Sequence, residues 1–512
     1  MWAVTFLVLL ILFPLRIHNK ATFKYCAWLI VFMELDYQKL GLKSGLEIHQ
    51  QLDTHKLFCN CPSFLRSDEP VFEIKRRLHA IAGETGEVDE AVLHEAKLGK
   101  EFIYQGYDTT CLVELDEAPP EMLNSEALKV ALQIALLLNC EIFPITQIMR
   151  KTVIDGSNTS GFQRTILLAR NGWVKTSYGK VVIESVALEE DAARIVGKTK
   201  GETIYRLDRL GIPLVEIVTA PEIYNPEQCK EVALHLGDIL RATRVKRGIG
   251  TIRQDVNVSI KGHPRVEIKG FQDVKMFVPT IEKEIERQLK SVNDKNLKSE
   301  VRNANADGTT TFMRPMPGSA RMYPETDLLL LKISRELINE IKNNLPKLRA
   351  EIKEELKIHG LSEELIKLLV SENKIEEFKE LIQINKDANL VAKMLVLWPK
   401  DISSKLKVSA ESVYKKLDMD ILEEILNAVK SKKIAKEIVQ EVLIKVAQGE
   451  SVEQALKVEQ ISLDDVEGYI TKLIREKPGL NYNAYMGLVM QKFKGRVSGK
   501  DIMNIIKKHI KN

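Results

Sequence analysis

The sequence is poor in cysteine and in aromatic residues, and its charges nearly cancel. Six cysteines in 512 residues are too few for a disulfide framework, which favours a reducing compartment and a cytoplasmic protein. Aromatic residues make up 6% of the chain, and the formal net charge is only +4. So small an excess argues against a protein that coats DNA, yet it permits a local basic face for RNA phosphates. The length allows roughly two to four domains.

Several motifs that would identify a mechanism are also missing. The chain has no GxxxxGK[ST] phosphate-binding loop, and no Ser–His–Asp or catalytic-cysteine arrangement stands out. Cys59 and Cys61 form a C-x-C pair, but no second C-x-x-C pair accompanies it. With Cys111, they would bind zinc only if a fourth ligand such as His55 or His79 were supplied. Free, at least partly buried thiols are the favoured alternative.

One strongly apolar run is present, at residues 2–16, ahead of a second methionine, Met33. A signal peptide or signal anchor is one interpretation. The run is shorter than the ~20 residues of a membrane span, and no small-residue cleavage site stands out. We favour a mis-assigned start, with 1–33 as an apolar leader, and we expect no membrane association.

The remaining sequence divides into a mixed part and a helical part. Between 34 and 330, short alternating stretches predict strands, with helices at Ser125–Leu138 and Pro226–Ala242. From 331 onward glycine is rare, and Leu and Ile recur at helical spacing. Helical examples are Glu363–Val370, Ile421–Val429 and Ile434–Val446. Because WPKD interrupts this pattern near 398, we predict an α+β protein with a mixed or antiparallel-sheet domain (34–330), a helical domain (331–398) and a small helical domain (399–512).

Three stretches in the first part alternate polar and apolar residues: Leu46–Gln51, Asp255–Ile260 and Arg265–Gly270. Such alternation places each polar set on one face of a strand. If the strands share a sheet, the polar sets form one floor, made of Glu47, His49, Asp255, Asn257, Glu267 and Lys269. The alternative is a solvated sheet face, although such faces rarely combine Glu, His, Asp and Asn.

Two further clusters are suited to a phosphate site. Glu189 and Glu190 precede Asp191, and three adjacent carboxylates repel one another unless water or a cation such as Mg²⁺ screens them. A solvated acidic turn or helix start is the alternative. The stretch 150–164 contains glycines between flanking cations, which suits phosphate, although it is equally typical of a turn-rich loop. Its candidate residues are Arg150, Lys151, Ser157, Asn158 and Arg164.

Eight motifs, in order, resemble the GatB/GatE family of tRNA-dependent amidotransferase subunits. They are GLEIHQQL, LFCNCPS, RKTVIDGSNTSGFQR, ALEEDAAR, RLDRLGIPLVEIVTAPEI, TIRQDVNVSI, VEIKGFQD and MRPMPGSARMYPETD. DGSNTSGFQR and PGSARMYPETD are more similar to the archaeal E subunit than to the bacterial B subunit, which would show a YxYPDxPKxYQ-like run at the first of them. The resemblance covers about 40–512 and implies a cradle-shaped catalytic domain, a helical domain and a YqeY-like tail.

The family implies a reaction in which ATP phosphorylates the γ-carboxylate of Glu esterified to tRNA(Gln), and ammonia then displaces phosphate. It also implies ATP and Mg²⁺, the Glu-tRNA(Gln) substrate, and an asparaginase-like D subunit as ammonia source, in a heterodimer or heterotetramer. The catalytic residues carried over by the resemblance are Glu47, His49, Glu189, Glu190, Asp255, Glu267 and Lys269, with His49, Glu190 and Glu267 as metal ligands. Those near the phosphates or the tRNA 3′ end are Arg150, Lys151, Ser157, Asn158, Arg164 and Asn257.

The chain departs from the family in one respect. E subunits normally carry a domain resembling an insert of bacterial aspartyl-tRNA synthetases, whereas here only SVNDKNLKS separates the helix around Val278–Leu289 from Glu300. We therefore expect the insert to be absent and the tail to contact the tRNA body. The tail candidates, for which a solvated helix face is the alternative, are Lys432, Lys433, Lys436, Lys492, Lys494 and Arg496.

Two alternative functions stay open. A catalytically inert tRNA-binding scaffold is disfavoured by the intact set Glu47, His49, Glu190, Asp255 and Glu267. A B-type subunit that pairs with A and C subunits is disfavoured by DGSNTSGFQR.

Overall fold

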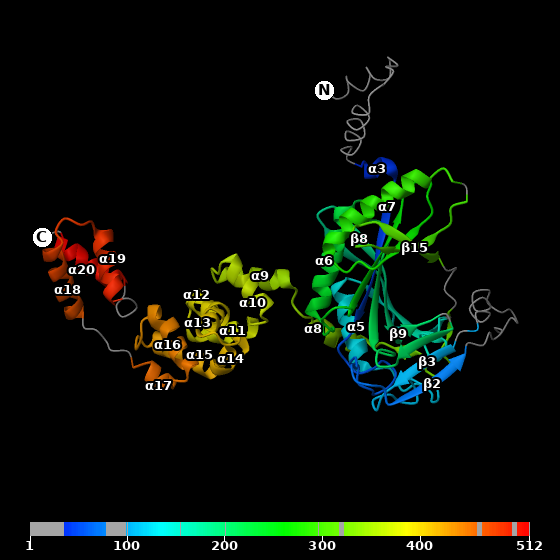
Figure 1. The fold of residues 1–512 in the computed structure, drawn as a ribbon, viewed down its shortest axis with the longest axis horizontal. Helices are drawn as coiled ribbons and strands as arrows, with labels where there is room; N and C mark the ends of the chain where they lie inside the picture. Colours follow the sequence, from blue (N-terminus) through cyan, green and yellow to red (C-terminus); the bar gives the residue numbers. More distant parts are fainter. Residues whose placement is uncertain are drawn as a thin grey trace, which may run out of the picture. The chain divides into compact units, whose positions relative to one another are not determined.

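The computed structural model describes residues 35–77, 99, 101–153, 155–199, 201–294, 296–316, 322–457, 463–493 and 499–510 (Figure 1). The predicted leader at 1–33 lies outside these residues. The chain divides into two compact units, the first ending at Pro346 and the second beginning at Lys347. In the described part of the chain, no helix has the length and apolarity needed to cross a membrane.

The described part of the first unit is organised by an eleven-stranded sheet. Its strands are β1 (Lys43–Gln51), β4 (Glu141–Ile142), β6 (Ile148–Thr152), β7 (Phe162–Thr176), β8 (Gly179–Glu190), β11 (Pro213–Thr219), β12 (Ile252–Ser259), β13 (Val266–Lys269), β14 (Glu300–Ala304), β15 (Thr310–Pro315) and β16 (Met322–Pro324). The order is β15-β14-β13-β12-β1-β11-β8-β7-β6-β16, with β4 also paired to β7. Only β13 and β14 run parallel among these described pairs. The mixed, mainly antiparallel sheet predicted from the sequence is confirmed.

Three helices pack against this sheet: α5 (Ser125–Leu137), α6 (Pro226–Ala242) and α7 (Phe277–Ser291). α5 contacts β7 and β8, α6 contacts β1 and β7, and α7 contacts β12 and β15. α5 and α6 begin after asparagine caps whose side chains accept amide hydrogen bonds, and α6 also has a proline in its first turn. The apolar members of the alternating strands, including Ile48, Val256 and Ile268, are fully buried. This burial places the core on one face of the sheet and leaves the other face for polar side chains.

Smaller elements complete the first unit. A four-stranded sheet has the order β2-β3-β10-β9, formed by β2 (Phe72–Arg77), β3 (Glu101–Gly106), β10 (Glu202–Arg206) and β9 (Arg194–Lys198). The remaining described elements are α3 (Tyr37–Leu40), η1 (Val274–Met276), β5 (Ile145–Thr146), β17 (Leu331–Lys332) and α8 (Arg335–Asn343). β17 pairs with β5, and α8 packs on α5. The first unit therefore continues past the predicted boundary at 330.

The described elements of the second unit are all helical. They are α9 (Arg349–Ile358), α10 (Glu363–Ser371), α11 (Ile375–Ile384), α12 (Ala388–Ala392), η2 (Lys393–Leu397), α13 (Trp398–Leu406), α14 (Ala410–Lys416), α15 (Met419–Lys430), η3 (Lys436–Ile438), α16 (Val439–Gln448), α17 (Val452–Ala455), α18 (Leu463–Glu476), α19 (Tyr482–Phe493) and α20 (Gly499–Ile510). Three of these helices were predicted from the sequence. α10 and α15 match their predicted ranges closely. α16 begins at Val439 rather than at Ile434, because the residues just before it form a cap and a 3₁₀ turn.

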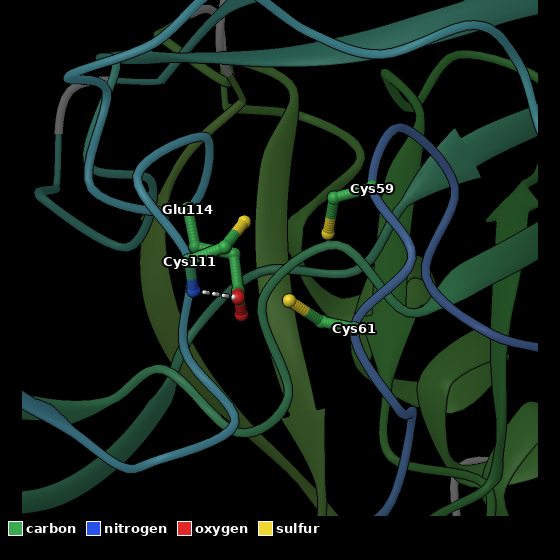
Figure 2. Close-up of side chains that lie close together, drawn as sticks. All are labelled: Cys59, Cys61, Cys111 and Glu114. Carbon is green, nitrogen blue, oxygen red and sulfur yellow. Dashed lines mark hydrogen bonds between the residues drawn. The ribbon is translucent and has the colours of Figure 1, made fainter.

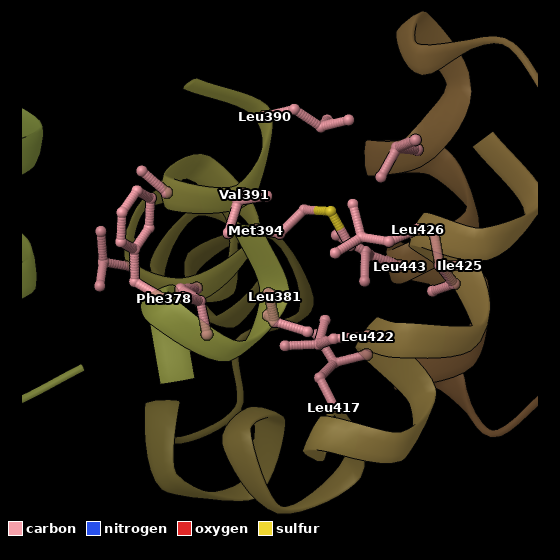
Figure 3. Packing of buried hydrophobic residues seen from close by; sticks show 14 of the residues in the cluster. Phe378, Leu381, Leu390, Val391, Met394, Leu417, Leu422, Ile425, Leu426 and Leu443 are labelled. Atoms are coloured by element: carbon pink, nitrogen blue, oxygen red, sulfur yellow. The ribbon is translucent and has the colours of Figure 1, made fainter. Parts of the chain in front are cut away.

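The predicted break at WPKD differs from the structure. Pro399 lies in the first turn of α13, directly after the π-helical turn η2. Proline lacks an amide hydrogen and cannot donate the backbone hydrogen bond of a regular α-helix. The widened π-helical turn lets the helix continue without that hydrogen bond. One core then runs from Leu356 to Leu456, across the predicted boundary at 398 (Figure 3). A separate core joins α18, α19 and α20, so apolar packing divides between Leu456 and Val466.

Candidate active site

Polar side chains from five neighbouring strands gather on the face of the large sheet opposite the core. Strand register pairs His49 with Glu216 on β11 and with Arg253 on β12. It also pairs Glu47 with Asp255, which in turn pairs with Lys269 on β13. Residues directly opposite each other in antiparallel strands share a face. The sheet therefore assembles the floor that the alternating stretches predicted.

His49 is the centre of this floor. Its Nε2 lies 3.3 Å from Glu216 Oε2, 3.6 Å from Glu47 Oε1 and 4.0 Å from Glu189 Oε2. Two groups of ligand atoms share this ring, each within 4.8 Å: Glu47–His49–Asp255 and His49–Glu189–Glu216. Burial would lower the pKa of His49, but the hydrogen bond with Glu216 and the nearby carboxylates raise it overall. The floor thus favours positive charge at its centre.

Two lysines offset part of the negative charge. Lys151 Nζ lies 3.6 Å from Glu189 Oε1 and 4.0 Å from Glu216 Oε2. Lys269 Nζ lies 2.6 Å from Asp255 Oδ2 and 2.5 Å from Glu267 Oε1. Burial opposes ionisation of Glu216, yet His49 and Lys151 lower its pKa to about 2.

Two other carboxyls of the floor, Glu47 and Glu189, have pKa values raised chiefly by burial. A divalent cation would compensate them, and carboxylate oxygens are the ligands that Mg²⁺ prefers. The imidazole of His49 is better suited to Mn²⁺ or to a contact through water.

A cavity of about 1250 Å³ opens over this floor. Its lining includes His49 and Glu189 from the floor, Lys151 beside them, and Ser157 and Asn158 from the predicted phosphate loop.

The rim of this cavity includes the turn at 248–250, in which Gly248 and Gly250 have φ values of 124° and 83°. These values are accessible chiefly to glycine. Between them, Ile249 is fully exposed. The turn therefore presents an apolar side chain at the mouth of a charged cavity.

Hydrogen bonds to the smaller sheet and to residues next to it fix the backbone of the predicted phosphate loop. Tyr104 Oη donates 2.7 Å to the Gly156 carbonyl. The amide of Ala193 donates 2.8 Å to the Ser157 carbonyl. Thr159 Oγ1 donates 2.6 Å to the Glu114 carbonyl. These bonds fix the backbone of the loop, while the Ser157 and Asn158 side chains line the cavity.

Glu190, Arg164 and Arg150 occupy a different environment. Glu190 follows Glu189 directly in β8, so their side chains point to opposite faces. Glu190 Oε2 lies 3.4 Å from an Arg164 guanidinium nitrogen, and Arg164 Nε donates 2.8 Å to buried Glu325. Arg150 also pairs with Glu325. The cavity lining contains neither arginine and does not contain Glu190.

The predicted metal-ligand set is therefore not brought together. His49 belongs to both ligand groups found among the described residues around the floor, but Glu190 and Glu267 belong to neither. Glu267 is instead engaged by Lys269, and Asn257 has a buried Oδ1 without a hydrogen-bond partner among the described residues. Strand alternation explains the result for Glu190, since adjacent residues cannot share a face. The sequence interpretation missed Glu216 and Glu325. Alternation in β11 places Glu216 opposite its apolar neighbours, but only the pairing of β11 with β1 brings it to the floor.

The cysteines form a separate cluster. Cys59, Cys61 and Cys111 lie together with Glu114, a residue that sequence reasoning did not select (Figure 2). His55 is not part of this group, and its Nδ1 lies 2.9 Å from the Lys56 carbonyl and 3.0 Å from the Cys59 carbonyl. His79 lies outside the described residues.

The predicted tRNA-body residues belong to the second unit. Lys432, Lys433, Lys436 and Lys492 are exposed. Lys436 Nζ lies 3.4 Å from Asp387, and Lys492 Nζ lies 4.1 Å from the centre of the Tyr469 ring. Lys494 and Arg496 lie outside the described residues.

Comparison with known proteins identifies the sheet-containing unit. The GatB/GatE catalytic domain model matches residues 42–339, which is more than half of the chain. The chain belongs to the GatB/GatE family. The match runs from β1 into α8 and includes every residue of the floor.

Similar curated proteins of this family are archaeal. The chain is 37% identical to the E subunit of the Glutamyl-tRNA(Gln) amidotransferase of Methanocaldococcus jannaschii, with 94% of this chain and 100% of that protein covered. It is 35% identical to the corresponding protein of Thermococcus sibiricus, with 93% and 99% covered. The first alignment extends over 633 positions, whereas this chain has 512 residues. That relative therefore contains residues without a counterpart here, which agrees with the expected lack of an insert.

Proposed function

We propose that this GatB/GatE-family chain is the ATP-using, tRNA-binding E subunit of a Glu-tRNA(Gln) amidotransferase. The observation that carries the proposal is the carboxylate floor around His49, which lies beneath a cavity of about 1250 Å³. The names of the archaeal relatives support the substrate assignment.

The reaction proceeds in two transfers. The γ-carboxylate of tRNA-bound glutamate attacks the γ-phosphorus of ATP, and ADP leaves. Ammonia then attacks the acyl phosphate carbon, inorganic phosphate leaves, and the lost proton passes to solvent, giving Gln-tRNA(Gln). Phosphoryl transfer requires positioning and charge compensation more than a protein nucleophile. The floor, which offers fixed charges and no serine–histidine pair, fits this demand.

The donor set at the floor fits a hard divalent cation. His49, Glu189 and Glu216 would hold Mg²⁺ or Mn²⁺, with Glu47 and Asp255 adjacent. When bound, the cation neutralises phosphate oxygens. Lys151 would orient a phosphate at the same wall, and Ser157 and Asn158 would bind phosphate or the tRNA 3′ end at the loop. Lys269 holds the Asp255 and Glu267 carboxylates in place through its two ion pairs.

Glu190, Arg164 and Arg150 have a supporting role in this proposal. Their charges are engaged by one another and by Glu325, so they fix β6, β7 and β8 to one another rather than contact substrate. Asn257 lies on β12 directly opposite Glu267 on β13, and its amide nitrogen would orient Glu267 across the ladder.

The partners follow from the reaction. An asparaginase-like D subunit supplies ammonia, and the complex works in the cytoplasm. The helical second unit, ending in a YqeY-like tail, binds the tRNA body through exposed lysines such as Lys432 and Lys433. With fewer residues than its relatives, this chain depends more on that tail.

The test is a coupled assay of the chain co-purified with a D-type partner, given Glu-tRNA(Gln), ATP and glutamine. The wild type is expected to form Gln-tRNA(Gln) only when ATP is present. Glu216→Gln should lose at least about 100-fold in rate, because the floor loses one fixed charge beside His49. Exposed Glu141→Gln is the matched control. Absence of ATP-dependent product from the wild type would contradict the proposal.

A further inference from the structure

We propose that Arg253 is a further catalytic residue, which binds the phosphoryl group as it passes from ATP to the substrate carboxylate. This role rests on the proposed function, because ATP and the floor cation belong to that proposal. Arg253 lies on β12 directly opposite His49 on β1. Side chains paired in this way have Cβ atoms about 4.5–5.5 Å apart. Arg253 therefore extends from the strand next to the ligand group His49–Glu189–Glu216, and it lines the same cavity.

A buried acid fixes one edge of the guanidinium group. Arg253 Nη2 donates 2.6 Å to Asp191 Oδ1, and Asp191 is only 1% exposed. Oδ2 of the same carboxylate accepts a 2.7 Å hydrogen bond from buried Gln51 Nε2, and the Ala192 amide donates 2.9 Å to Oδ1. Because both oxygens of Asp191 are engaged, the carboxylate holds the arginine in one orientation before a ligand binds. Donors that are oriented in advance are the ones that stabilise developing charge best.

The other edge of the guanidinium group is open to the cavity. An arginine side chain has five N–H donors, and in Arg253 only Nη2 has an acceptor among the described residues. The side chain is 43% exposed. The remaining donors can therefore bind two oxygens of one phosphoryl group, which matches the fork of the guanidinium group.

The charges around Asp191 leave a positive excess. Arg209 Nε lies 3.9 Å from Asp191 Oδ1, so two arginines share this one carboxylate. Burial and the charge of Arg253 lower the pKa of Arg209, although Asp191 opposes them. Arg209 donates to the Ala192 and Ala193 carbonyls and does not line the cavity. An anion bound at Arg253 would compensate the excess, and the place for it lies beside the ligand group of the floor.

The transfer requires no proton from Arg253. The γ-carboxylate oxygen of tRNA-bound glutamate forms a bond with the γ-phosphorus of ATP. The bond from that phosphorus to the β,γ-bridging oxygen breaks, and its electron pair leaves with ADP. Arg253 donates hydrogen bonds to oxygens of the transferred group throughout. Arginines in such positions accelerate phosphoryl transfer by about 10³–10⁵-fold in other enzymes.

The first measurement is nucleotide binding by the full chain with Mg²⁺ present, followed by titration calorimetry. AMP-PNP carries a γ-phosphoryl group, whereas ADP lacks one. Arg253→Lys should weaken AMP-PNP binding at least about tenfold and ADP binding less than about threefold, because lysine keeps the charge but loses the fork. Arg209→Lys is the matched control, since Arg209 shares Asp191 without lining the cavity, and it should change neither affinity. Equal weakening of both nucleotides by Arg253→Lys would overturn the proposal.

The second measurement is ADP formation on addition of Glu-tRNA(Gln), by the complex with a D-type partner. Arg253→Ala should lower kcat at least about 100-fold while KM for ATP rises less than about tenfold. Millimolar guanidinium chloride should then raise the rate of this variant at least about tenfold, because Asp191 can hold a free guanidinium ion in the vacated place. The double variant Arg253→Ala, Asp191→Asn should not be rescued. A purely structural role of Arg253 predicts no rescue in either variant, and that result would overturn the proposal.

This role and the proposed function fail in different ways. Wild-type rates of ADP formation in Arg253→Ala would overturn the role of Arg253 and leave the proposed function intact. If Arg253→Lys selectively loses AMP-PNP but the wild-type complex forms no ADP with Glu-tRNA(Gln), the proposed function is contradicted, while Arg253 stands as a residue that binds the γ-phosphoryl group. A folded wild-type chain that binds neither nucleotide would contradict both.

Discussion

Glu189 and Glu190 are neighbours in one strand, yet they belong to different kinds of site. Glu189 faces the floor, where the carboxylates outnumber Lys151, Lys269 and His49, and where Arg253 is already paired with Asp191. Glu190 faces the other way, toward Arg164, which is also paired with Glu325. One face accumulates unmatched negative charge, while the other pairs its acids with arginine. Buried charge without a partner is costly unless a ligand compensates it. The comparison therefore indicates that the floor face, rather than the face of Glu190, binds a ligand.

The largest effect is expected from replacing Glu325, which pairs with both arginines on the face where acids and arginines are matched. Glu325→Gln removes the partner of both Arg150 and Arg164 and should lower the free energy of unfolding by about 3–5 kcal/mol at pH 7. Urea unfolding followed by circular dichroism measures it. A decrease of less than about 1 kcal/mol would show that the arginines find other partners.

The same variant has a defined pH dependence. Burial would raise the pKa of Glu325, but hydrogen bonds from Arg150, the Asp327 amide and Arg164 lower it below 4.5. A carboxyl with a depressed pKa stabilises the fold above its unfolded-state pKa, and that stabilisation is lost as pH falls through the folded-state value. The difference between wild type and Glu325→Gln should therefore be full at neutral pH and shrink below pH 4.5. A difference that grows on acidification would contradict this assignment.

The next largest effect is expected from Glu189 and Glu190, the two neighbours in β8 that face opposite sides of the sheet. Glu189→Gln should lower ATP-dependent Gln-tRNA(Gln) formation at least about 100-fold, or about 2.7 kcal/mol in activation free energy, with an unchanged urea midpoint. Glu190→Gln should instead lower stability by about 1–3 kcal/mol and change the rate less. Equal decreases in rate, with stability unaffected in both, would restore Glu190 as a metal ligand.

A smaller effect is expected in the second unit, where charge is exposed rather than buried. Replacing Lys432, Lys433 and Lys436 by alanine should weaken tRNA binding uniformly across tRNA species. The slope of log K against log salt should fall by roughly one for each phosphate that the variant no longer neutralises. Filter binding at several salt concentrations measures this. An unchanged slope would leave these lysines as a solvated helix face.

The smallest effect is predicted for Lys230, a partly exposed residue of α6 that pairs with Glu227. Lys230→Ala should change stability by less than about 0.5 kcal/mol and leave the tRNA salt slope unchanged. A larger change in either measurement would show that surface charges outside the floor and tail also matter.

Sequence reasoning recovered what local patterns encode. Period-two alternation located β1, β12 and β13 and the floor they carry, and helical spacing located α5, α6 and α10. The missing parts depend on long-range pairing. Glu216 joins the floor only because β11 lies next to β1, and Glu114 joins the cysteines only through the packing of two loops. The break predicted at WPKD was wrong because a π-helical turn accommodates Pro399.

We expect the floor around His49 to be the place where this chain uses ATP. The most direct measurement is ADP formation from ATP on addition of Glu-tRNA(Gln), with no amide donor present, for the complex with a D-type partner. The wild type should release ADP only with Glu-tRNA(Gln), and Glu189→Gln should release at least about 100-fold less while still binding the tRNA. ADP release by Glu189→Gln at the wild-type rate would contradict the account.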